Sequence, residues 1–310
     1  MDPHFFKYQA LGNDYLVIDA GIFGSGVFAD HAADKGYPFG ESPAALSLRP
    51  TLRAICDRHF GIGGDGILVG EGLGLDKAGG DFFGDADEET FVLRIFNPDG
   101  SEAEKSGNGL RIFARHVFET NPRHPRRFSI ATKGGLAGIS ILADDGSLVR
   151  VDMGMPDFGG EGEIIDMAAE FDGRPVLMSR VSMGNPHCVL RGLLVDESNA
   201  RRIGPIVEND PRFPNRTNVQ LLEVLARDEI RIEIWERGAG YTLSSGSSSC
   251  AAAAVARRLG LVDDRLRVST PGGVLSVDFV EGRAHLTGPV GKVCEGAFSP
   301  EFAVAWGLAC

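Results

Sequence analysis

One arrangement occurs twice in this chain: a junction of serine, glycine and other small residues runs directly into a helix-forming segment. The first is KSGNGLRIFARHV at residues 105–117, and the second is YTLSSGSSSCAAAAVARRL at residues 241–259. Apolar residues recur in both at spacings of three and four, which indicates a helix. Strand-like segments precede each junction, so the chain is predicted to consist of two halves with the same order of elements.

The segments around these helices are predicted to be β-strands because they are rich in β-branched and apolar residues and end at Gly, Asp or Asn. The predicted strands lie in residues 6–20 (broken by a Gly-Asn-Asp turn), 66–72, 89–97, 127–134, 136–143, 147–154, 219–238 (two strands turning at 226–228) and 274–290 (a hairpin turning at 281–282). A shorter helix is predicted in 51–61. The glycine-rich stretches 21–48 and 70–89 are predicted to be surface loops.

Size and charge exclude several classes of protein. A length of 310 residues is typical of a chain with two domains. The chain has 31 Lys and Arg against 43 Asp and Glu, a net charge of −12, which argues against a nucleic-acid partner. The one basic cluster, within 121–127, also holds two prolines and is predicted to be a solvated linker. No run of 18 apolar residues or secretion signal occurs, so we expect a cytoplasmic protein with no membrane partner.

The cysteines and histidines do not form a recognisable metal or disulfide pattern. The five cysteines are irregularly spaced, which fits a reducing compartment. No CxxC motif, zinc-ligand histidine pair or GxxxxGK[ST] loop occurs. The two junctions themselves allow two interpretations. In the first, the junctions only cap the two helices, because Ser and Asn are good N-cap residues. In the second, the free N–H groups and dipoles of the two helix starts together hold an anion such as a carboxylate.

Further motifs accompany the two junctions. In chain order they are ALGNDYLVID, CDRHFGIGGDGILV, FNPDGSEAEKSGNGLRIFARHV, MGNPHCVL, TNVQLLEV and ERGAGYTLSSGSSSCAAAAVA. Together they resemble the diaminopimelate epimerase family, whose members epimerise an amino acid without pyridoxal phosphate. The resemblance runs from about residue 5 to about residue 299.

The resemblance implies the fold and the location of the site. The expected fold is α+β, with two pseudo-symmetric domains that are each a curled antiparallel sheet around a central helix. The expected domains are residues 1–124 with 288–310, and residues 125–287. The family site lies between the domains, where one cysteine from each takes or returns the α-proton of the substrate.

Both catalytic cysteine positions of the family are serines here, Ser106 and Ser245, and the remaining Cys188 and Cys250 occupy positions that the family does not use. A thiol has a pKa near 8.5, whereas the pKa of an alcohol lies closer to that of water, roughly five units higher. Forming the serine anion therefore costs about 7 kcal/mol more than forming the thiolate. Serines therefore need an assisting base. The resemblance points to His187 and Glu236 as the catalytic assistants.

The positions that hold the substrate in the family are largely kept. The residues that match its substrate-binding set are Asn13, Asn97, Gly107, Asn108, Asn185, Asn218, Arg237, Gly246 and Ser247. An Arg fork binds a carboxylate in a bidentate manner, and Asn supplies both a donor and an acceptor. The expected ligand is a small amino acid with a second polar end, and no cofactor or metal is expected. Tyr241 stands where the family usually has Glu, which leaves the ligand open, and the resemblance suggests a homodimer.

Three interpretations remain open from the residues. The first is an epimerase acting on diaminopimelate or a related carbon acid, with serines in place of cysteines. The second is a non-catalytic binding protein that kept the pocket and lost the thiols. The third is a deliberate Cys→Ser exchange at both positions, against which the other unusual residues in KSGN and SSGSSS argue.

Overall fold

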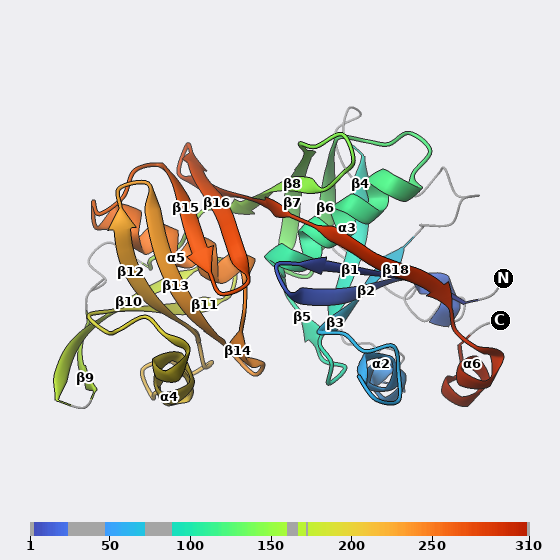
Figure 1. The fold of residues 1–310 in the computed structure, drawn as a ribbon, viewed down its shortest axis with the longest axis horizontal. Coiled ribbons are helices and arrows are strands. Elements are labelled where there is room, and N and C mark those ends of the chain that lie inside the picture. Colours follow the sequence, from blue (N-terminus) through green and yellow to red (C-terminus); the bar gives the residue numbers. More distant parts are fainter. Residues whose placement is uncertain (1–2, 24–46, 72–88, 160–166, 172, 309–310) are drawn as a thin grey trace. The chain divides into compact units, whose positions relative to one another are not determined.

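The described chain folds into two compact units (Figure 1). The computed structural model describes residues 3–23, 47–71, 89–159, 167–171 and 173–308. The first unit comprises residues 1–10, 14–149 and 290–310, and the second comprises 11–13 and 150–289. The predicted boundary after residue 124 lies earlier than this one. Strands β6 and β7 belong to the first unit because β6 pairs with β4 and β7 pairs with β6.

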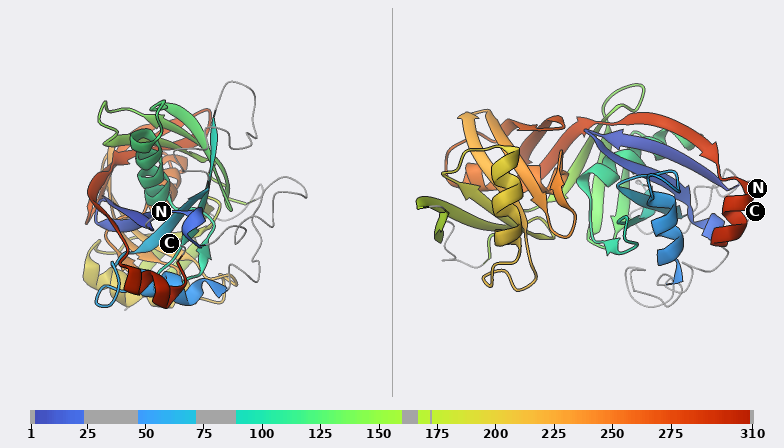
Figure 2. Two further views of the ribbon diagram at one scale, coloured as in Figure 1. Left: turned by 90° about the vertical axis from the view of Figure 1, so that its right-hand side faces the viewer. Right: turned by 60° about the horizontal axis from the view of Figure 1, so that its bottom comes forward.

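The first unit is a mixed sheet with one long helix against it. Its elements are β1 (His4–Ala10), β2 (Asn13–Asp19), the 3-10 helix η1 (Ala20–Phe23), α2 (Arg49–Cys56), β3 (Gly66–Glu71), β4 (Thr90–Phe96), β5 (Glu102–Ala103), α3 (Gly107–Thr120), β6 (Arg127–Thr132), β7 (Gly135–Ile141), β18 (Gly291–Ala297) and α6 (Pro300–Trp306). Strand pairing follows the order β18, β1, β2, β3, β4, β6, β7. Figure 2 (left) shows strands on several sides of α3, the long green helix.

The second unit repeats this plan. Its elements are β8 (Leu148–Gly154, beginning in the first unit), β9 (Met167–Phe171), β10 (Arg174–Ser182), β11 (Pro186–Arg191), α4 (Glu197–Glu208), β12 (Asn218–Ala226), β13 (Glu229–Glu236), β14 (Gly240–Thr242), α5 (Gly246–Arg258), β15 (Arg265–Thr270), β16 (Gly273–Val280) and β17 (Arg283–Pro289). Strand β13 pairs with β12, β14 and β15, just as β4 pairs with β3, β5 and β6. The predicted internal repeat is therefore present at the level of strand pairing.

The predicted α+β class is confirmed, although the sheets are not purely antiparallel. Pairs β2–β3 and β4–β6 are parallel in the first unit, and β11–β12 and β13–β15 are parallel in the second. Each parallel pair needs a crossover connection, and α3 and α5 supply two of these crossovers. The helices thereby begin at matching points of the two units, which is the structural reason for the repeated junction.

The central helices are buried almost all round, which explains their composition. Every residue of α5 from Gly246 to Ala256 is buried, and the helix contacts strands β10 to β13 and β15 to β17. A helix enclosed by a sheet has no polar face, and small side chains let the strands approach closely. In α3, residues 107–114 are likewise buried. Both helix starts are thus held rigidly by packing.

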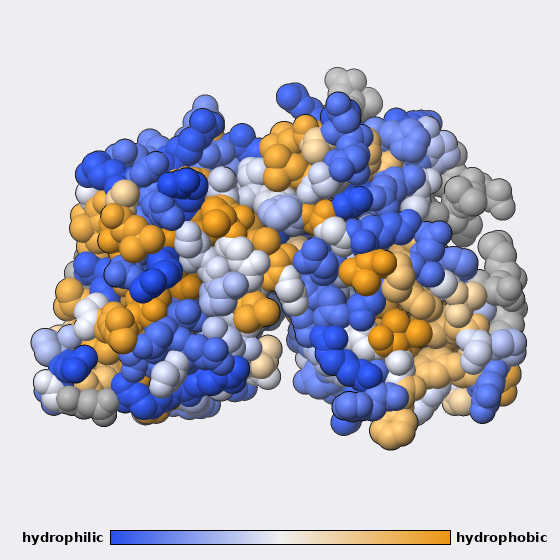
Figure 3. Space-filling model, viewed as in Figure 1, coloured by the Kyte–Doolittle hydropathy of each residue, from blue (hydrophilic) through white to orange (hydrophobic). Residues whose placement is uncertain are grey.

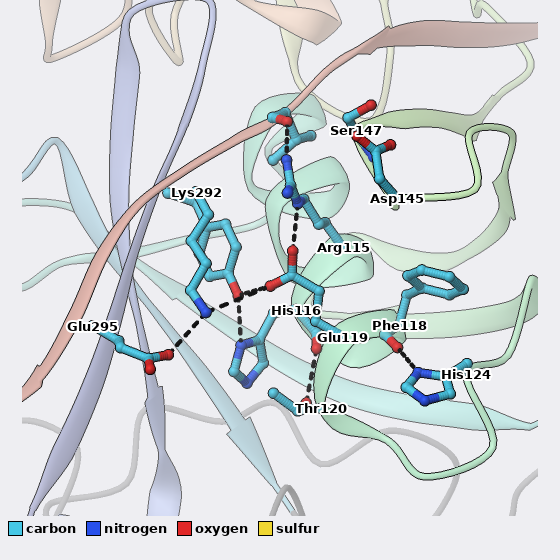
Figure 4. A network of polar contacts seen from close by, with 12 residues as sticks. Arg115, His116, Phe118, Glu119, Thr120, His124, Asp145, Ser147, Lys292 and Glu295 are labelled. Carbon is cyan, nitrogen blue, oxygen red and sulfur yellow. Dashed lines mark hydrogen bonds and ion pairs between the residues drawn. The ribbon is translucent and has the colours of Figure 1, made fainter.

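The far half of α3 is fastened to β1 and β18 by a polar network (Figure 4). Glu119 accepts a hydrogen bond from the Tyr8 hydroxyl at 2.8 Å and pairs with Arg115 at 2.7 Å. The Nδ1 atom of His116 lies 3.2 Å from the same hydroxyl. Since Tyr8 donates to Glu119, the His116 ring donates from Nδ1 and is neutral. Burial lowers the pKa of His116 to about 3.

Several local expectations are confirmed, and two helices were not predicted. The turns at 226–228 and 281–282 lie between β12 and β13 and between β16 and β17. Helix α2 ends at Cys56, earlier than predicted. Helices α4 and α6 carry weaker signals, since Pro205 lies inside α4. The predicted loops 21–48 and 70–89 lie almost entirely outside the described residues.

The surface is mixed in character. On the face drawn in Figure 3, patches of hydrophobic residues are separated by hydrophilic ones in both units. Single exposed apolar side chains, such as Val293 at 55% exposure, are normal on a folded surface. Among the described residues, no helix has the length and apolar character needed to cross a membrane.

Candidate active site

The first junction places Ser106 at the N-terminus of α3. Its backbone is extended, with φ −136° and ψ 118°, and its Oγ accepts a hydrogen bond from the Gly109 N–H at 3.0 Å. The Tyr15 hydroxyl lies 3.4 Å from the same Oγ. The helix has 14 residues, so its dipole favours a negative charge at this end. The predicted N-cap role of Ser106 is confirmed.

Arg111 orients the first turn of α3 from inside the unit. Its side chain is fully buried, and Nη2 donates to the Asn108 Oδ1 at 2.7 Å while Nη1 donates to the Gly107 carbonyl at 3.2 Å. This contact fixes which end of the Asn108 amide is the acceptor and directs the N–H₂ group elsewhere. A donor at a helix N-terminus suits a carboxylate ligand.

Asn97 lies in the turn that leads to the first junction. Its Nδ2 donates to the Ser101 Oγ at 3.0 Å, and its backbone N–H donates to the Ser101 carbonyl at 2.8 Å. The strands on either side are joined by a bidentate ion pair between Arg94 and Glu102, with distances of 2.8 and 2.9 Å. Both of these side chains are at most 5% exposed. Asn97 is therefore part of a rigid turn.

Asn13 begins β2 directly after a tight turn. Leu11 and Gly12 both have positive φ angles there, 54° and 86°. The next residue, Asp14, accepts from Arg58 at 2.6 Å and pairs with Lys7 at 2.9 Å. These cations hold the pKa of Asp14 at about 2 against the opposing effect of its burial. The ion pairs on Asp14 fix the chain at the point where Asn13 ends the turn.

The second junction differs from the first in how its serine is held. Ser245 caps α5 with φ −141° and ψ 125°, but its side chain makes no capping hydrogen bond. Its carbonyl accepts from the Ser249 N–H at 3.0 Å and from the Ser249 hydroxyl at 2.8 Å. The side chain is 4% exposed, and Gly246 and Ser247 follow it as buried residues. The Ser245 hydroxyl is thus less constrained than that of Ser106.

His187 lies in a buried hydrogen-bonded chain on the α5 side of the second sheet. The Gln220 Nε2 lies 3.1 Å from the His187 Nδ1 and 3.0 Å from the Ser248 Oγ, and the His187 Nε2 lies 2.9 Å from the Asn185 Oδ1. Because the Gln220 amide donates, Nδ1 accepts and Nε2–H donates to Asn185. Burial lowers the pKa of His187 to about 3.

Both ring nitrogens of His187 have hydrogen-bond partners, and the neutral ring donates to the Asn185 Oδ1. The expected catalytic role of His187 stays a prediction. Sequence reasoning missed Gln220, although strand alternation already places it on the same face as Asn218. No sequence signal joins Gln220 to His187, which lies 33 residues away.

Asn218, Glu236 and Arg237 meet where β12 begins and β13 ends. The Asn218 Nδ2 donates to the Pro186 carbonyl at 2.9 Å, and its Oδ1 accepts from the Arg237 N–H at 2.9 Å. Asn218 therefore ties three predicted site segments together. Val219, Leu221 and Trp235 pack in a core cluster with α4, so strand alternation directs Glu236 toward α5.

Glu208 supports this turn from the opposite side. The side chain is 4% exposed, and its carboxylate accepts from the Trp235 Nε1 at 2.7 Å, from the Gly238 N–H at 2.8 Å and from Arg216. Three segments thus converge on one buried acceptor at the end of α4. Glu208 was not predicted, because its function depends on a fold contact between α4 and β13.

Tyr241 contacts residues on the α4 side of the second sheet. Its hydroxyl donates to the Glu233 Oε2 at 2.8 Å, and the Arg201 guanidinium lies 4.4 Å from its ring centroid. Both contacts are on the α4 side of the sheet, whereas α5 lies on the other. Tyr241 therefore contributes to packing on the α4 side.

Of the four described cysteines, Cys56, Cys188 and Cys250 are buried, whereas Cys294 is exposed. Cys188 and Cys250 are fully buried, and burial raises the pKa of Cys188 far above its ordinary value. Burial likewise raises the pKa of Cys56 to about 12. Such thiols are unreactive. Among the described residues, no group of three His, Cys, Asp or Glu side chains is arranged to hold a metal ion.

The two buried histidines predict a loss of stability in acid. Both are neutral in the folded protein with pKa values of about 3, against an ordinary value of 6.5. Below about pH 6.5 the unfolded chain binds up to two more protons than the folded one, so stability is full above that pH and falls toward pH 3. The expected slope is about 2.7 kcal/mol per pH unit.

Urea unfolding between pH 7 and pH 4.5 measures this slope. His116→Gln and His187→Gln are each expected to remove about half of it, whereas the same change at the exposed His59 leaves it unaltered. A slope unaffected by both buried substitutions would assign the acid sensitivity to other groups.

Comparisons with known proteins agree with this arrangement. A family model described as diaminopimelate epimerase matches residues 31–159 and 179–293. Diaminopimelate epimerase 2 of Nostoc sp. is 44% identical over 309 residues and covers 96% of each chain. Diaminopimelate epimerase of Stutzerimonas stutzeri is 36% identical, covering 94% of this chain and 97% of that one.

The solved structures bear on the fold. A hydroxyproline epimerase from Agrobacterium vitis superposes with a TM-score of 0.69 at 16% identity, covering 97% of this chain and 93% of that chain. An identity this low shows a common fold alone. The family match and the near full-length relatives together lead to one conclusion: this chain belongs to the diaminopimelate epimerase family.

Proposed function

We propose that this protein is an isomerase that exchanges the α-proton of a small amino acid, interconverting L,L- and meso-diaminopimelate or inverting a related carbon acid, without pyridoxal phosphate. The observation that carries the proposal is the pair of equivalent helix starts, each with a serine at the N-cap of a buried helix. Relatives that carry the epimerase name over nearly the full length support it. In the family this reaction belongs to lysine biosynthesis.

We assign roles to the site residues on the basis of the family motifs and the local geometry. Ser106 and Ser245 each handle one proton transfer, and Glu236 assists Ser245. The amides that begin α3 and α5 bind the α-carboxylate, through Gly107, Asn108, Gly246 and Ser247. Asn13, Asn97, Asn185, Asn218 and Arg237 hold or frame the distal end of the substrate. The neutral His187 keeps the Asn185 amide in one orientation.

The non-catalytic alternative is less well supported. A binding protein that had lost its chemistry has no need to keep a hydroxyl at both helix starts. Here both are present, and one is held by two contacts, from Gly109 and Tyr15. The family resemblance also leads us to propose a homodimer, which light scattering after gel filtration tests directly.

Proton exchange in D₂O tests the function. The protein is incubated with L,L-diaminopimelate, meso-diaminopimelate and a panel of other amino acids, and loss of the α-proton signal is followed by NMR. We expect exchange with diaminopimelate or a close analogue. The Ser106→Ala/Ser245→Ala variant is expected to abolish it. Binding of a substrate without any exchange would instead establish a binding protein.

A further inference from the structure

We propose that Tyr15 is a catalytic residue that works with Ser106, its phenol oxygen exchanging a proton with the serine hydroxyl during turnover. This inference rests on the proposed function of Ser106. It answers the difficulty that an alcohol is a much weaker acid than the thiol found at this position in the family. No motif assigns a role to the Tyr15 hydroxyl.

The fold directs this phenol toward the helix start. Tyr15 lies in β2 beside Gly66 of β3, in parallel register. A Cβ atom at position 66 would lie 2.6 Å from the Tyr15 Cε1 and 2.5 Å from the Phe96 carbonyl oxygen. Only glycine therefore leaves room for the ring, which is 7% exposed. Packing thus holds the hydroxyl 3.4 Å from the Ser106 Oγ.

The remaining contact of Ser106 sets the direction of its proton. The Gly109 N–H donates to the Ser106 Oγ at 3.0 Å, which occupies one lone pair. The serine O–H is then able to point at the Tyr15 oxygen. A separation of 3.4 Å is long for an O–H···O bond, but catalytic hydrogen bonds are often long before a substrate binds and shorten in the complex.

The different acidities of the two hydroxyls explain why a phenol beside Ser106 would assist proton transfer. A phenol ionises near pH 10 and an alcohol nearer to water, roughly 15 to 16. At pH 7 roughly one phenol in 10³ is ionised, against fewer than one alcohol in about 10⁸. The N-terminus of α3 also favours negative charge at this place. An ordinary phenol is therefore closer in acidity to a thiol than an alcohol is.

The proposed step begins from the Tyr15 phenolate, which forms when the phenol gives its proton to solvent water. The α C–H bond of the substrate breaks and its proton forms a new bond to the Ser106 Oγ. The former serine proton passes at the same time to the Tyr15 phenolate, which becomes the phenol again. The electron pair of the C–H bond stays on the substrate as a carbanion stabilised by its carboxylate. In the opposite direction each of these bond changes is reversed.

A mutant cycle tests the coupling between the two hydroxyls. The proteins are the unmodified chain, Tyr15→Phe, Ser106→Cys and the double variant, each assayed for α-proton exchange of diaminopimelate in D₂O. We expect Tyr15→Phe to lower exchange at least 10-fold when serine is present and less than 2-fold when position 106 is a thiol. Added to Ser245→Cys instead, Tyr15→Phe should still lower exchange at least 10-fold.

The control is Tyr8→Phe, which removes another buried hydroxyl of the same unit, bonded to Glu119 and His116. It is expected to leave exchange unchanged. Equal losses from Tyr15→Phe with Ser or Cys at position 106 would show a structural role and overturn the proposal, as would no loss in either.

A second measurement keeps this inference separate from the proposed function. In Ser106→Cys, the rate at which iodoacetamide alkylates the introduced thiol at pH 8 reports its environment without any substrate. A phenol beside the thiolate stabilises it by donating a hydrogen bond, so Tyr15→Phe is expected to slow alkylation several-fold. Slower alkylation without exchange in any variant would contradict the proposed function alone, whereas an unchanged alkylation rate would contradict the contact.

Discussion

Replacing both junction serines by cysteine is expected to accelerate α-proton exchange of diaminopimelate by about 10²- to 10³-fold, because a base whose pKa lies nearer the working pH transfers protons faster. The pKa of the thiol is roughly five units below that of the alcohol, and about half of that difference is expected to appear in the logarithm of the exchange rate. The N-terminal dipoles of α3 and α5 stabilise the thiolate further. The Ser106→Cys/Ser245→Cys variant, assayed in D₂O by NMR, measures the change.

Single variants and a matched control sharpen this result. Ser106→Cys and Ser245→Cys alone are each expected to give part of the gain, because in the proposed mechanism each hydroxyl handles one proton transfer. The control is Ser299→Cys, since Ser299 caps α6 through a hydrogen bond from the Phe302 N–H and lies in neither junction. It is expected to change nothing. A double variant no faster than the unmodified protein would mean that proton transfer does not pass through these positions.

Glu208→Ala is expected to lower the free energy of unfolding by about 3 kcal/mol and to weaken substrate binding. The alanine leaves the Trp235 Nε1–H without its acceptor, and it removes the partner of Arg216 and of the Gly238 N–H. The turn that carries Glu236 and Arg237 then loses its support. Urea unfolding midpoints at constant slope measure the stability, and titration with diaminopimelate measures the binding.

Glu208→Gln separates charge from geometry. The glutamine keeps an acceptor oxygen for Trp235 but loses the acceptor of the Gly238 N–H and the ion pair with the half-exposed Arg216, so we expect a smaller loss of about 2 kcal/mol. Equal stability of the alanine and glutamine variants would show that the carboxylate oxygens do not hold this turn.

The sequence predicted those parts of the fold that depend on local patterns. The helices beginning at Gly107 and Gly246, and the turns at 226–228 and 281–282, were recognisable because their residues repeat with the period of a helix or carry turn residues. Helix α4 was not predicted, because Pro205 and Gly204 break its pattern while Ile203 and Val207 pack on the sheet. Tertiary packing overrides local preference there.

The sequence motifs supply a list of candidate site residues, which stays a prediction, but not the contacts of those residues. The motifs point to Ser106, Asn218 and His187, and no local feature indicates what each one touches. The bond between Gln220 and His187, and the approach of Tyr15 to Ser106, join residues that lie 33 and 91 positions apart. Such contacts follow from strand register, which a single sequence does not specify.

The order of segments along the chain has a consequence for synthesis. Strand β1, residues 4–10, pairs with β18, residues 291–297, and the whole of β8 to β17 is made between them. On the ribosome the second unit therefore has all its strands before the first has its last one. The first unit therefore begins to form first but is completed last. Until β18 is synthesised, one edge of β1 is unpaired, and an exposed strand edge of this kind promotes aggregation. Removing the last 20 residues would make that transient state permanent.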